Sequence, residues 1–216
     1  MNENYDSNLI NQLEDIDNAH EKFKSMDGLS LINGPLKNLF IKYKVFDTYG
    51  AGILHSHFPL KQTERLVTFT NTSIAIDVND LNENVKQSLK PSSFIFDDEG
   101  TLHSFEYTYK ESQHEKEKLS NEFINDLYKL LYQTKFINLI CLVDLTLIPK
   151  GFEQTQGFAN ITIPKHIFNC DRVDNNKYLD VVWSFNPFNT QVACERKCFM
   201  GFNNSHQPLH FHWGGK

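Results

Sequence analysis

Two short segments of the sequence each carry a pair of histidines separated by one residue. The first is Leu-His-Ser-His-Phe, with His55 and His57, and the second is Leu-His-Phe-His-Trp, with His210 and His212. In a β-strand, residues i and i+2 project from the same face, so each pair would aim two imidazoles in one direction. Because neutral imidazole is the commonest metal ligand in proteins, each pair is a candidate half of a metal site.

If the two histidine strands are neighbours, four imidazoles could converge on one divalent cation. We expect His55, His57, His210 and His212 to be the metal ligands, with Glu64 as a weaker ligand or a base. Zinc or iron suits such ligands, and the matching reactions are metal-assisted hydrolysis or hydration, or an oxygen-dependent step. A catalytic centre would use three protein ligands and leave one position for water. Alternate histidines on a solvated sheet face need no metal, which is the competing interpretation.

Cysteines near the C-terminal end offer a second set of ligands. Cys194, Cys198, His206 and His210 have the two-thiolate, two-imidazole content of a structural zinc site. Cys194 and Cys198 with His210 and His212 are another version of it, with a better spacing between the cysteine and histidine pairs. Against this, a chain of 216 residues can fold on its own core without a metal. The two cysteines would then be small buried residues.

Three resemblances to known families follow from these residues. His-Phe-His-Trp-Gly at 210–214 resembles the zinc strand of the alpha-type carbonic anhydrases, in which both histidines ligate the metal. That family's third histidine lies well downstream, and the sequence ends four residues after His212, so we reject this family. His55 and His57 followed by Glu64 resemble the cupin metal motif, with a longer gap before the glutamate. The segment 50–58, together with a Cys- and His-rich tail, resembles a set of uncharacterised fungal and slime-mould proteins, which implies no activity.

The first 28 residues combine an amphipathic pattern with a negative charge. A series of residues spaced three and four apart predicts an amphipathic helix, and its members are Ile10, Leu13, Ile16, His20, Phe23 and Met26. The segment holds seven acidic and two basic residues. We therefore expect residues 1–28 to form an acidic helix, followed by a single α+β domain over residues 29–216. The acidic face of this helix could bind a protein partner.

The rest of the chain alternates between helix-like and strand-like patterns. Apolar positions from Leu119 to Leu131 predict a long helix, and the apolar run 136–148 predicts a central strand covered on both faces. Further strands are predicted at 53–58, 65–70, 73–78, 94–96, 102–109, 157–163, 178–185, 191–202 and 209–213. The predicted fold is α+β, with a mostly antiparallel sheet as a sandwich or open barrel, an N-terminal helix and one long central helix.

Composition narrows the classes of function. The net charge of −6 argues against a nucleic-acid partner, which would need clustered Lys and Arg. No segment approaches the ~20 apolar residues of a membrane-spanning helix, so no membrane partner is expected. No glycine-rich phosphate loop is present, and no organic cofactor is indicated. The N-terminal residues lack a secretory pattern, which predicts a cytoplasmic protein with free thiols. The rival to a metal enzyme is a non-catalytic interaction or structural protein, with at most a structural zinc near the C-terminus.

Overall fold

A computed structural model of the chain describes residues 5–111, 119–167 and 177–199. The α-helices are α1 (Ser7–Asn11), α2 (Ile16–Ser25), α3 (Gly28–Leu31), α4 (Lys37–Lys42), α5 (Glu83–Ser88) and α6 (Asn121–Gln133). The strands are β1 (Tyr49–Ile53), β2 (Glu64–Phe69), β3 (Thr72–Asp77), β4 (Leu89–Phe96), β5 (Leu102–Tyr109), β6 (Ile140–Asp144), β7 (Gly151–Gln156), β8 (Ala159–Pro164), β9 (Tyr178–Ser184) and β10 (Ala193–Phe199). Single helical turns lie at Ile32–Leu36, Val78–Asp80 and Lys165–Ile167.

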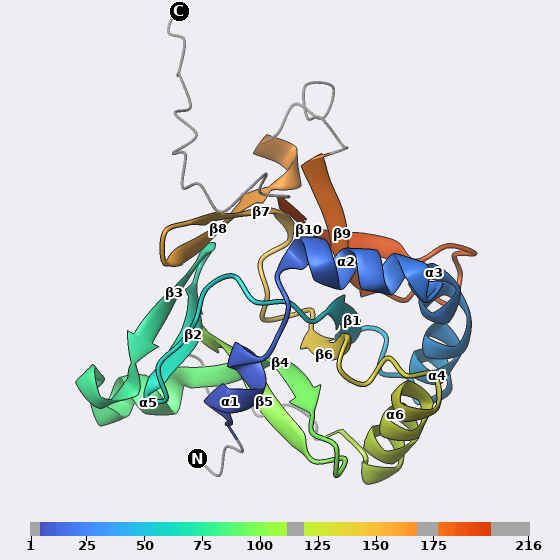
Figure 1. Ribbon diagram of the computed structural model, residues 1–216, viewed down its shortest axis with the longest axis horizontal. Coiled ribbons are helices and arrows are strands. Elements are labelled where there is room, and N and C mark those ends of the chain that lie inside the picture. The colour runs from blue at the N-terminus through green and yellow to red at the C-terminus, as the bar shows by residue number, and fades with distance from the viewer. Residues whose placement is uncertain (1–4, 112–118, 168–176, 200–216) are drawn as a thin grey trace, which may run out of the picture.

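These strands form one closed barrel, in the order β1-β6-β4-β5-β2-β3-β8-β7-β10-β9 (Figure 1). Most neighbours are antiparallel, as predicted, whereas the pairs β2–β5 and β7–β10 are parallel. The barrel closes where Ala51 and Gly52 of β1 lie opposite Trp183 and Val182 of β9. A Cβ atom on Gly50 would lie 2.3 Å from the Trp183 carbonyl oxygen, so glycine permits this close approach. The prediction of a sandwich or open barrel is therefore wrong, because the β1–β9 pairing leaves no open edge.

Helices α2, α3, α4 and α6 cover one side of the barrel (Figure 1). Aromatic rings pack the helices against the barrel and against each other. Phe23 of α2 stacks on Trp183 of β9 at 5.2 Å between centroids, and Phe40 of α4 meets Phe123 of α6 edge-on at 5.3 Å. The predicted long central helix corresponds to α6, which has 13 residues and lies outside the barrel. It cannot be central because only one of its faces is buried, through Phe123, Leu127 and Leu131. Among the described residues, no helix is long and apolar enough to cross a bilayer.

The N-terminal segment forms two helices instead of the single one predicted. Asp15 marks the start of the second helix, α2. Its side chain accepts a hydrogen bond from the Asn18 backbone N–H at 2.9 Å, which is the N-cap arrangement at the beginning of a helix. Asp15 also forms an isolated bridge with Ser56, in the segment after β1. The apolar residues Ala19 and Phe23 of α2 are fully buried in the protein's own core. Any partner of this segment would therefore meet its polar, acidic side.

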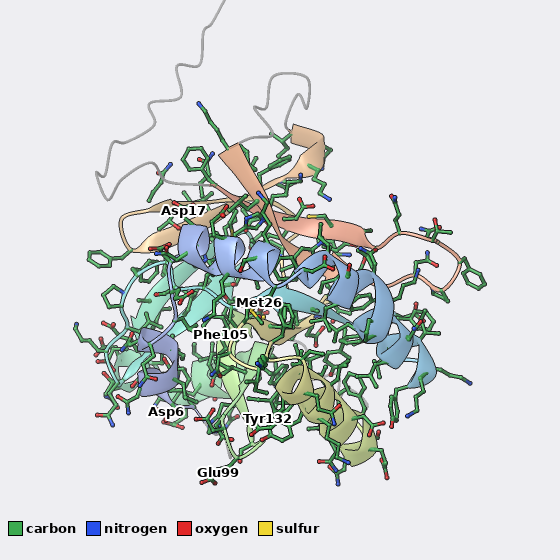
Figure 2. All side chains as sticks on the ribbon, turned by 45° about the vertical axis from the view of Figure 1, so that its right-hand side comes forward. Asp6, Asp17, Met26, Glu99, Phe105 and Tyr132 are labelled. Carbon is green, nitrogen blue, oxygen red and sulfur yellow. The ribbon has the colours of Figure 1, made fainter. Side chains whose placement is uncertain are left out.

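Strand β6 separates two different environments. Ile140 and Leu142 face the helices, in an apolar cluster that we call the helix-side core, and this cluster includes Phe40 and Phe123. Cys141 and Val143 point the other way, into the barrel. The predicted two-sided burial is confirmed, although the strand itself is shorter than the apolar run. Figure 2 shows side chains filling the space between the helices and the strands, with exposed residues such as Tyr132 and Glu99 at the periphery.

Candidate metal centre

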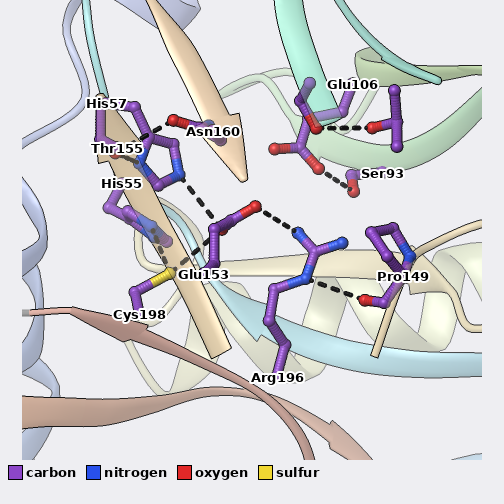
Figure 3. A network of polar contacts seen from close by, with 12 residues as sticks. His55, His57, Ser93, Glu106, Pro149, Glu153, Thr155, Asn160, Arg196 and Cys198 are labelled. Carbon is purple, nitrogen blue, oxygen red and sulfur yellow. Dashed lines mark hydrogen bonds and ion pairs between the residues drawn. The ribbon is translucent and has the colours of Figure 1, made fainter. Parts of the chain in front are cut away.

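Four side chains with metal-binding atoms converge inside the barrel: His55, His57, Glu153 and Cys198, which we call the four-donor group (Figure 3). The two histidines follow β1, Glu153 belongs to β7, and Cys198 belongs to β10. One ligand atom from each residue lies within 4.8 Å of the ligand atoms of the other three. Segments far apart in the sequence thus supply a single cluster.

The hairpin of β7 and β8 positions the carboxylate. Gly157 adopts a left-handed conformation (φ 61°) at the turn, where a side chain would be strained. Across the hairpin, Glu153 lies opposite Thr162 and Thr155 lies opposite Asn160. Directly opposed residues on antiparallel strands project from the same face, so these four polar side chains share one face of the hairpin. Glu153, Asn160 and Thr162 are buried on it, whereas Thr155, near the turn, is exposed.

An irregularity in β10 determines which of its cysteines reaches the group. Cys194 lies opposite Trp183, whose ring packs in the helix-side core, whereas Arg196 lies opposite Val182, which lines the barrel cavity. The register shift between these positions turns Cys194 outward, although it is two residues from Arg196. Beyond the shift, Arg196 and Cys198 are both buried on the inner face.

Hydrogen bonds fix the orientation of both imidazoles. Nδ1 of His55 donates to the Ile53 carbonyl oxygen at 2.9 Å. Nδ1 of His57 lies 2.8 Å from the Thr155 hydroxyl, which in turn donates to Oδ1 of Asn160 at 3.0 Å. The Thr155 oxygen therefore accepts from the His57 ring. In both rings Nε2 keeps a free lone pair directed at the group, which is how metal-binding histidines are held.

Three of the six separations between the donor atoms are close to those around a tetrahedral ion. Sγ of Cys198 lies 3.4 Å from Nε2 of His55 and 3.2 Å from Oε2 of Glu153, and that oxygen lies 3.5 Å from Nε2 of His57. Ligands at about 2.0–2.3 Å from a tetrahedral metal are separated from one another by roughly 3.3–3.6 Å. Only one proton, that of the Cys198 thiol, lies among three acceptor atoms. The group therefore has more acceptor lone pairs than protons, and a bound cation would fill the excess lone pairs.

The other oxygen of Glu153 is paired with a buried arginine. Nη1 of Arg196 lies 3.4 Å from Oε1 of Glu153, and Nε of Arg196 donates to the Pro149 carbonyl at 3.3 Å. Nearby, the Ser93 hydroxyl donates to Oε2 of Glu106 at 2.8 Å (Figure 3). With Arg196 positive, Glu106 and Glu153 negative, and Cys198 as the thiolate that metal binding would create, the formal charge would be −2, which a divalent cation would neutralise.

Burial and local charges set the protonation of the group. Burial, reinforced by the neighbouring His55, lowers the pKa of His57 to about 4, and burial also lowers the pKa of His55. Burial would raise the pKa of Glu153, but the Arg196 charge and the other contacts lower it to about 2. Burial and the Glu153 carboxylate raise the pKa of the Cys198 thiol well above its usual range. Two neutral imidazoles and one carboxylate are thus ready to bind a metal, which would displace the thiol proton.

The structure brings together only part of the predicted ligand set. His55, His57 and Cys198 meet in one cluster, whereas His206, His210 and His212 lie outside the described residues. Glu64 is elsewhere, at the start of β2, where its carboxylate accepts a hydrogen bond from the Lys61 backbone and pairs with the Lys61 ammonium. Cys194 packs against the helix-side core, and its thiol donates to the Arg196 carbonyl at 3.2 Å.

Sequence reasoning missed Glu153 and Arg196. In β10 three charged residues, Glu195, Arg196 and Lys197, follow one another, so the pattern gives no direction for Arg196, whereas in β7 the apolar neighbour Phe152 was the available signal for Glu153. Around Glu153 the sequence reads Gly-Phe-Glu-Gln-Thr-Gln-Gly, so Phe152 marks one face and Glu153 with Thr155 marks the other. A buried Glu153 next to a turn glycine could have been proposed as a ligand on that basis.

The fold and the site together define an α+β closed-barrel protein with a buried four-donor group at one end of its interior. The chain matches no family model, and comparison with curated proteins and with solved structures gives no significant match. The functional argument therefore depends on the chemistry of the site.

Proposed function

We propose that this chain is a metalloprotein that binds one divalent transition-metal ion at His55, His57, Glu153 and Cys198. The observation that carries the proposal is the convergence of four donor atoms within 4.8 Å of one another, with both imidazoles oriented by hydrogen bonds on their far nitrogens. Bound metal would satisfy the lone pairs that now share a single thiol proton.

Zinc is the metal that best suits this donor set. A thiolate with imidazoles is a soft set of ligands that favours zinc over magnesium or calcium. The two histidines and Glu153 also have the content of the two-histidine, one-carboxylate triad of non-haem iron. That triad occupies one face of an octahedron, in which ligands lie closer together than in a tetrahedron. The 3.5 Å separation between His57 and Glu153 and the fourth, sulfur donor therefore favour zinc.

Metal-assisted hydrolysis or hydration is the activity that we propose for this site. Three of the four donor residues, His55, His57 and Glu153, also line a small cavity inside the barrel, so a metal there would face a space that a water-sized molecule could occupy. The same cavity contains Glu106, a carboxylate that could accept a proton from a metal-bound water. An oxygen-dependent reaction is the corresponding proposal if the resident metal is iron.

A structural zinc is the second candidate, and a specific observation favours it. Four protein donors complete a tetrahedron without a water molecule, which is typical of structural sites. Cys198 and Glu153 belong to neighbouring parallel strands, so a metal between them would also tie β7 to β10. Removal of a structural zinc should lower the melting temperature substantially, whereas removal of a purely catalytic one should leave it nearly unchanged.

Metal analysis of the purified 216-residue chain tests the proposal. We expect close to one equivalent of zinc per chain in the wild type and a loss of most of it in a His55→Ala/His57→Ala double variant. His103→Ala is the matched control, because His103 pairs with Asp97 at 2.8 Å, away from the four-donor group. A His210→Ala/His212→Ala variant shows whether the C-terminal pair contributes ligands. Stoichiometric zinc in the His55→Ala/His57→Ala variant would contradict the proposal.

A further inference from the structure

A small cavity lies against one side of the four-donor group. His55, His57 and Glu153 line it, whereas Cys198 is not among its lining residues. The cavity has about 20 Å³ of space for the centres of water-sized molecules. One water needs about 10–15 Å³ by this measure, so the cavity has room for a water-sized ligand and little more.

The opposite wall of the cavity limits what can enter it. Its apolar part includes Phe105, Val143 and Val182, and its polar part includes Ser93 and Glu106, which are hydrogen-bonded to each other at 2.8 Å. The cavity therefore excludes a bulky organic group by volume. A small polar molecule, by contrast, would find a polar wall within the same space.

Glu153 differs from the other three donors because it has a second buried partner. Its Oε2 faces Cys198 and His57, and its Oε1 lies 3.4 Å from Nη1 of Arg196 (Figure 3). The guanidinium is held independently by its bond to the Pro149 carbonyl. Glu153 could therefore release a metal and still be neutralised by Arg196. A buried carboxylate without such a partner would be strongly destabilising.

We propose that His55, His57 and Cys198 are the permanent ligands of the metal and that Glu153 is the exchangeable one. The released position would face the cavity and take a water-sized donor, such as water itself or a small inorganic anion. This inference rests on the proposed metal binding and adds the size class of the ligand. Three protein ligands with one exchangeable position are the arrangement of catalytic zinc.

Azide binding to the cobalt-substituted chain tests the inference. Cobalt(II) replaces zinc in tetrahedral sites and reports its ligands in the visible spectrum. We expect azide to change the visible bands in a saturable way. Benzoate, which has the same charge and a larger volume, should leave them unchanged at equal concentration. Full cobalt loading without any azide response would overturn the inference while leaving the metal site intact, and failure to load cobalt at all would instead refute the proposed function.

A Glu153→Gln variant identifies the exchangeable ligand. Because the amide competes less strongly for the metal than the carboxylate does, azide should bind at least tenfold more tightly than in the wild type, with cobalt still bound. Since Glu153→Gln leaves Arg196 unpaired, a Glu153→Gln/Arg196→Met variant supplies a second measurement that avoids an isolated buried charge. Unchanged or weaker azide affinity in the cobalt-loaded double variant would show that Glu153 is not the ligand that exchanges.

Discussion

The two faces of β6 open onto regions of opposite character. On the outer face, Ile140 and Leu142 belong to the helix-side core, where Phe40 and Phe123 are fully buried and the contacts are apolar. On the inner face, Cys141 lines a cavity whose wall also includes two imidazoles and the buried ion pair of Glu153 and Arg196. One sheet therefore separates a region that stabilises the fold from a region that holds polar groups out of water.

The inner region carries polar groups that packing alone does not explain. Among the described residues, Nδ2 of Asn160 and Oγ1 of Thr162 are buried without a hydrogen-bond partner. Burying unpaired polar atoms destabilises a protein, as does burying charges such as Arg196 and Glu153. The helix-side core must offset this. The residues that stabilise the fold and the residues that could bind a metal thus lie on opposite faces of β6. Variants on one face should therefore change the free energy of unfolding, and variants on the other should change the metal affinity.

The largest effect on stability is expected from Phe40→Ala in the helix-side core. Phe40 is fully buried and contacts Phe123 and Phe185, so truncation should lower the free energy of unfolding by about 3–5 kcal/mol. Denaturant titration of the metal-free chain measures this loss. Zinc bound per folded chain should stay at the wild-type value, and a parallel loss of zinc affinity would refute the separation of the two regions.

Arg196→Met should produce the next largest effect, and metal should reverse part of it. The variant leaves the Glu153 carboxylate buried without its counter-charge, which costs about 3 kcal/mol in the metal-free chain. Zinc would supply the missing positive charge, so zinc should stabilise the variant more than it stabilises the wild type. Denaturant titrations with and without zinc measure the difference. Equal stabilisation of both chains would place the metal away from Glu153.

Thr155→Val tests the orientation of His57 with a smaller effect. Loss of the hydroxyl that receives the His57 Nδ1 hydrogen bond should weaken zinc binding by about 10–100-fold, with little change in the metal-free stability. Competition with a chromophoric chelator measures the affinity. Thr63→Val is the matched control, because its hydroxyl bonds Asp77 at 2.7 Å, outside the four-donor group. A similar affinity loss in both variants would count against this role for Thr155.

Ser120→Ala should give the smallest effect, confined to α6. The Ser120 hydroxyl accepts a hydrogen bond from the Phe123 backbone N–H at 3.1 Å and caps the helix. Its loss should lower the free energy of unfolding by about 1 kcal/mol, measured by denaturant titration. Zinc affinity should be unchanged, because α6 lies on the opposite side of β6 from the metal ligands. A change in that affinity would mean that the two regions are coupled.

Sequence patterns predicted the elements whose burial is periodic. The apolar positions of α6 and the two-sided run around β6 were visible because hydrophobic spacing follows directly from which face is buried. The strands predicted at 94–96 and 102–109 correspond to parts of β4 and β5, and Gly100 (φ 85°) lies in the turn between them. His55 and His57 were predicted as ligands from their alternate spacing in a strand at 53–58. That strand prediction is wrong, because β1 ends at Ile53, and both imidazoles reach the four-donor group from the segment after it.

The closure of the barrel and the complete donor set could not be obtained this way. Strand order depends on contacts between distant segments, such as β1 with β9. The hydrophobic periodicity of a segment shows which of its faces is buried, but it does not show which strand lies beside it. The register shift in β10 also reverses the expectation for Cys194, because a bulge changes the face without changing the residue types. Glu153 looks in sequence like any charged strand residue, and only its neighbours across the barrel show its role.

The most direct test of the central claim is the near-ultraviolet spectrum of the cobalt-loaded chain. A thiolate ligand gives cobalt(II) an intense charge-transfer band, and Cys198 is the only sulfur in the four-donor group. The wild type and Cys194→Ala should both show this band, whereas Cys198→Ala should lose it. A band that survives in Cys198→Ala, or that disappears in Cys194→Ala, would contradict the assignment of the metal centre to the barrel interior.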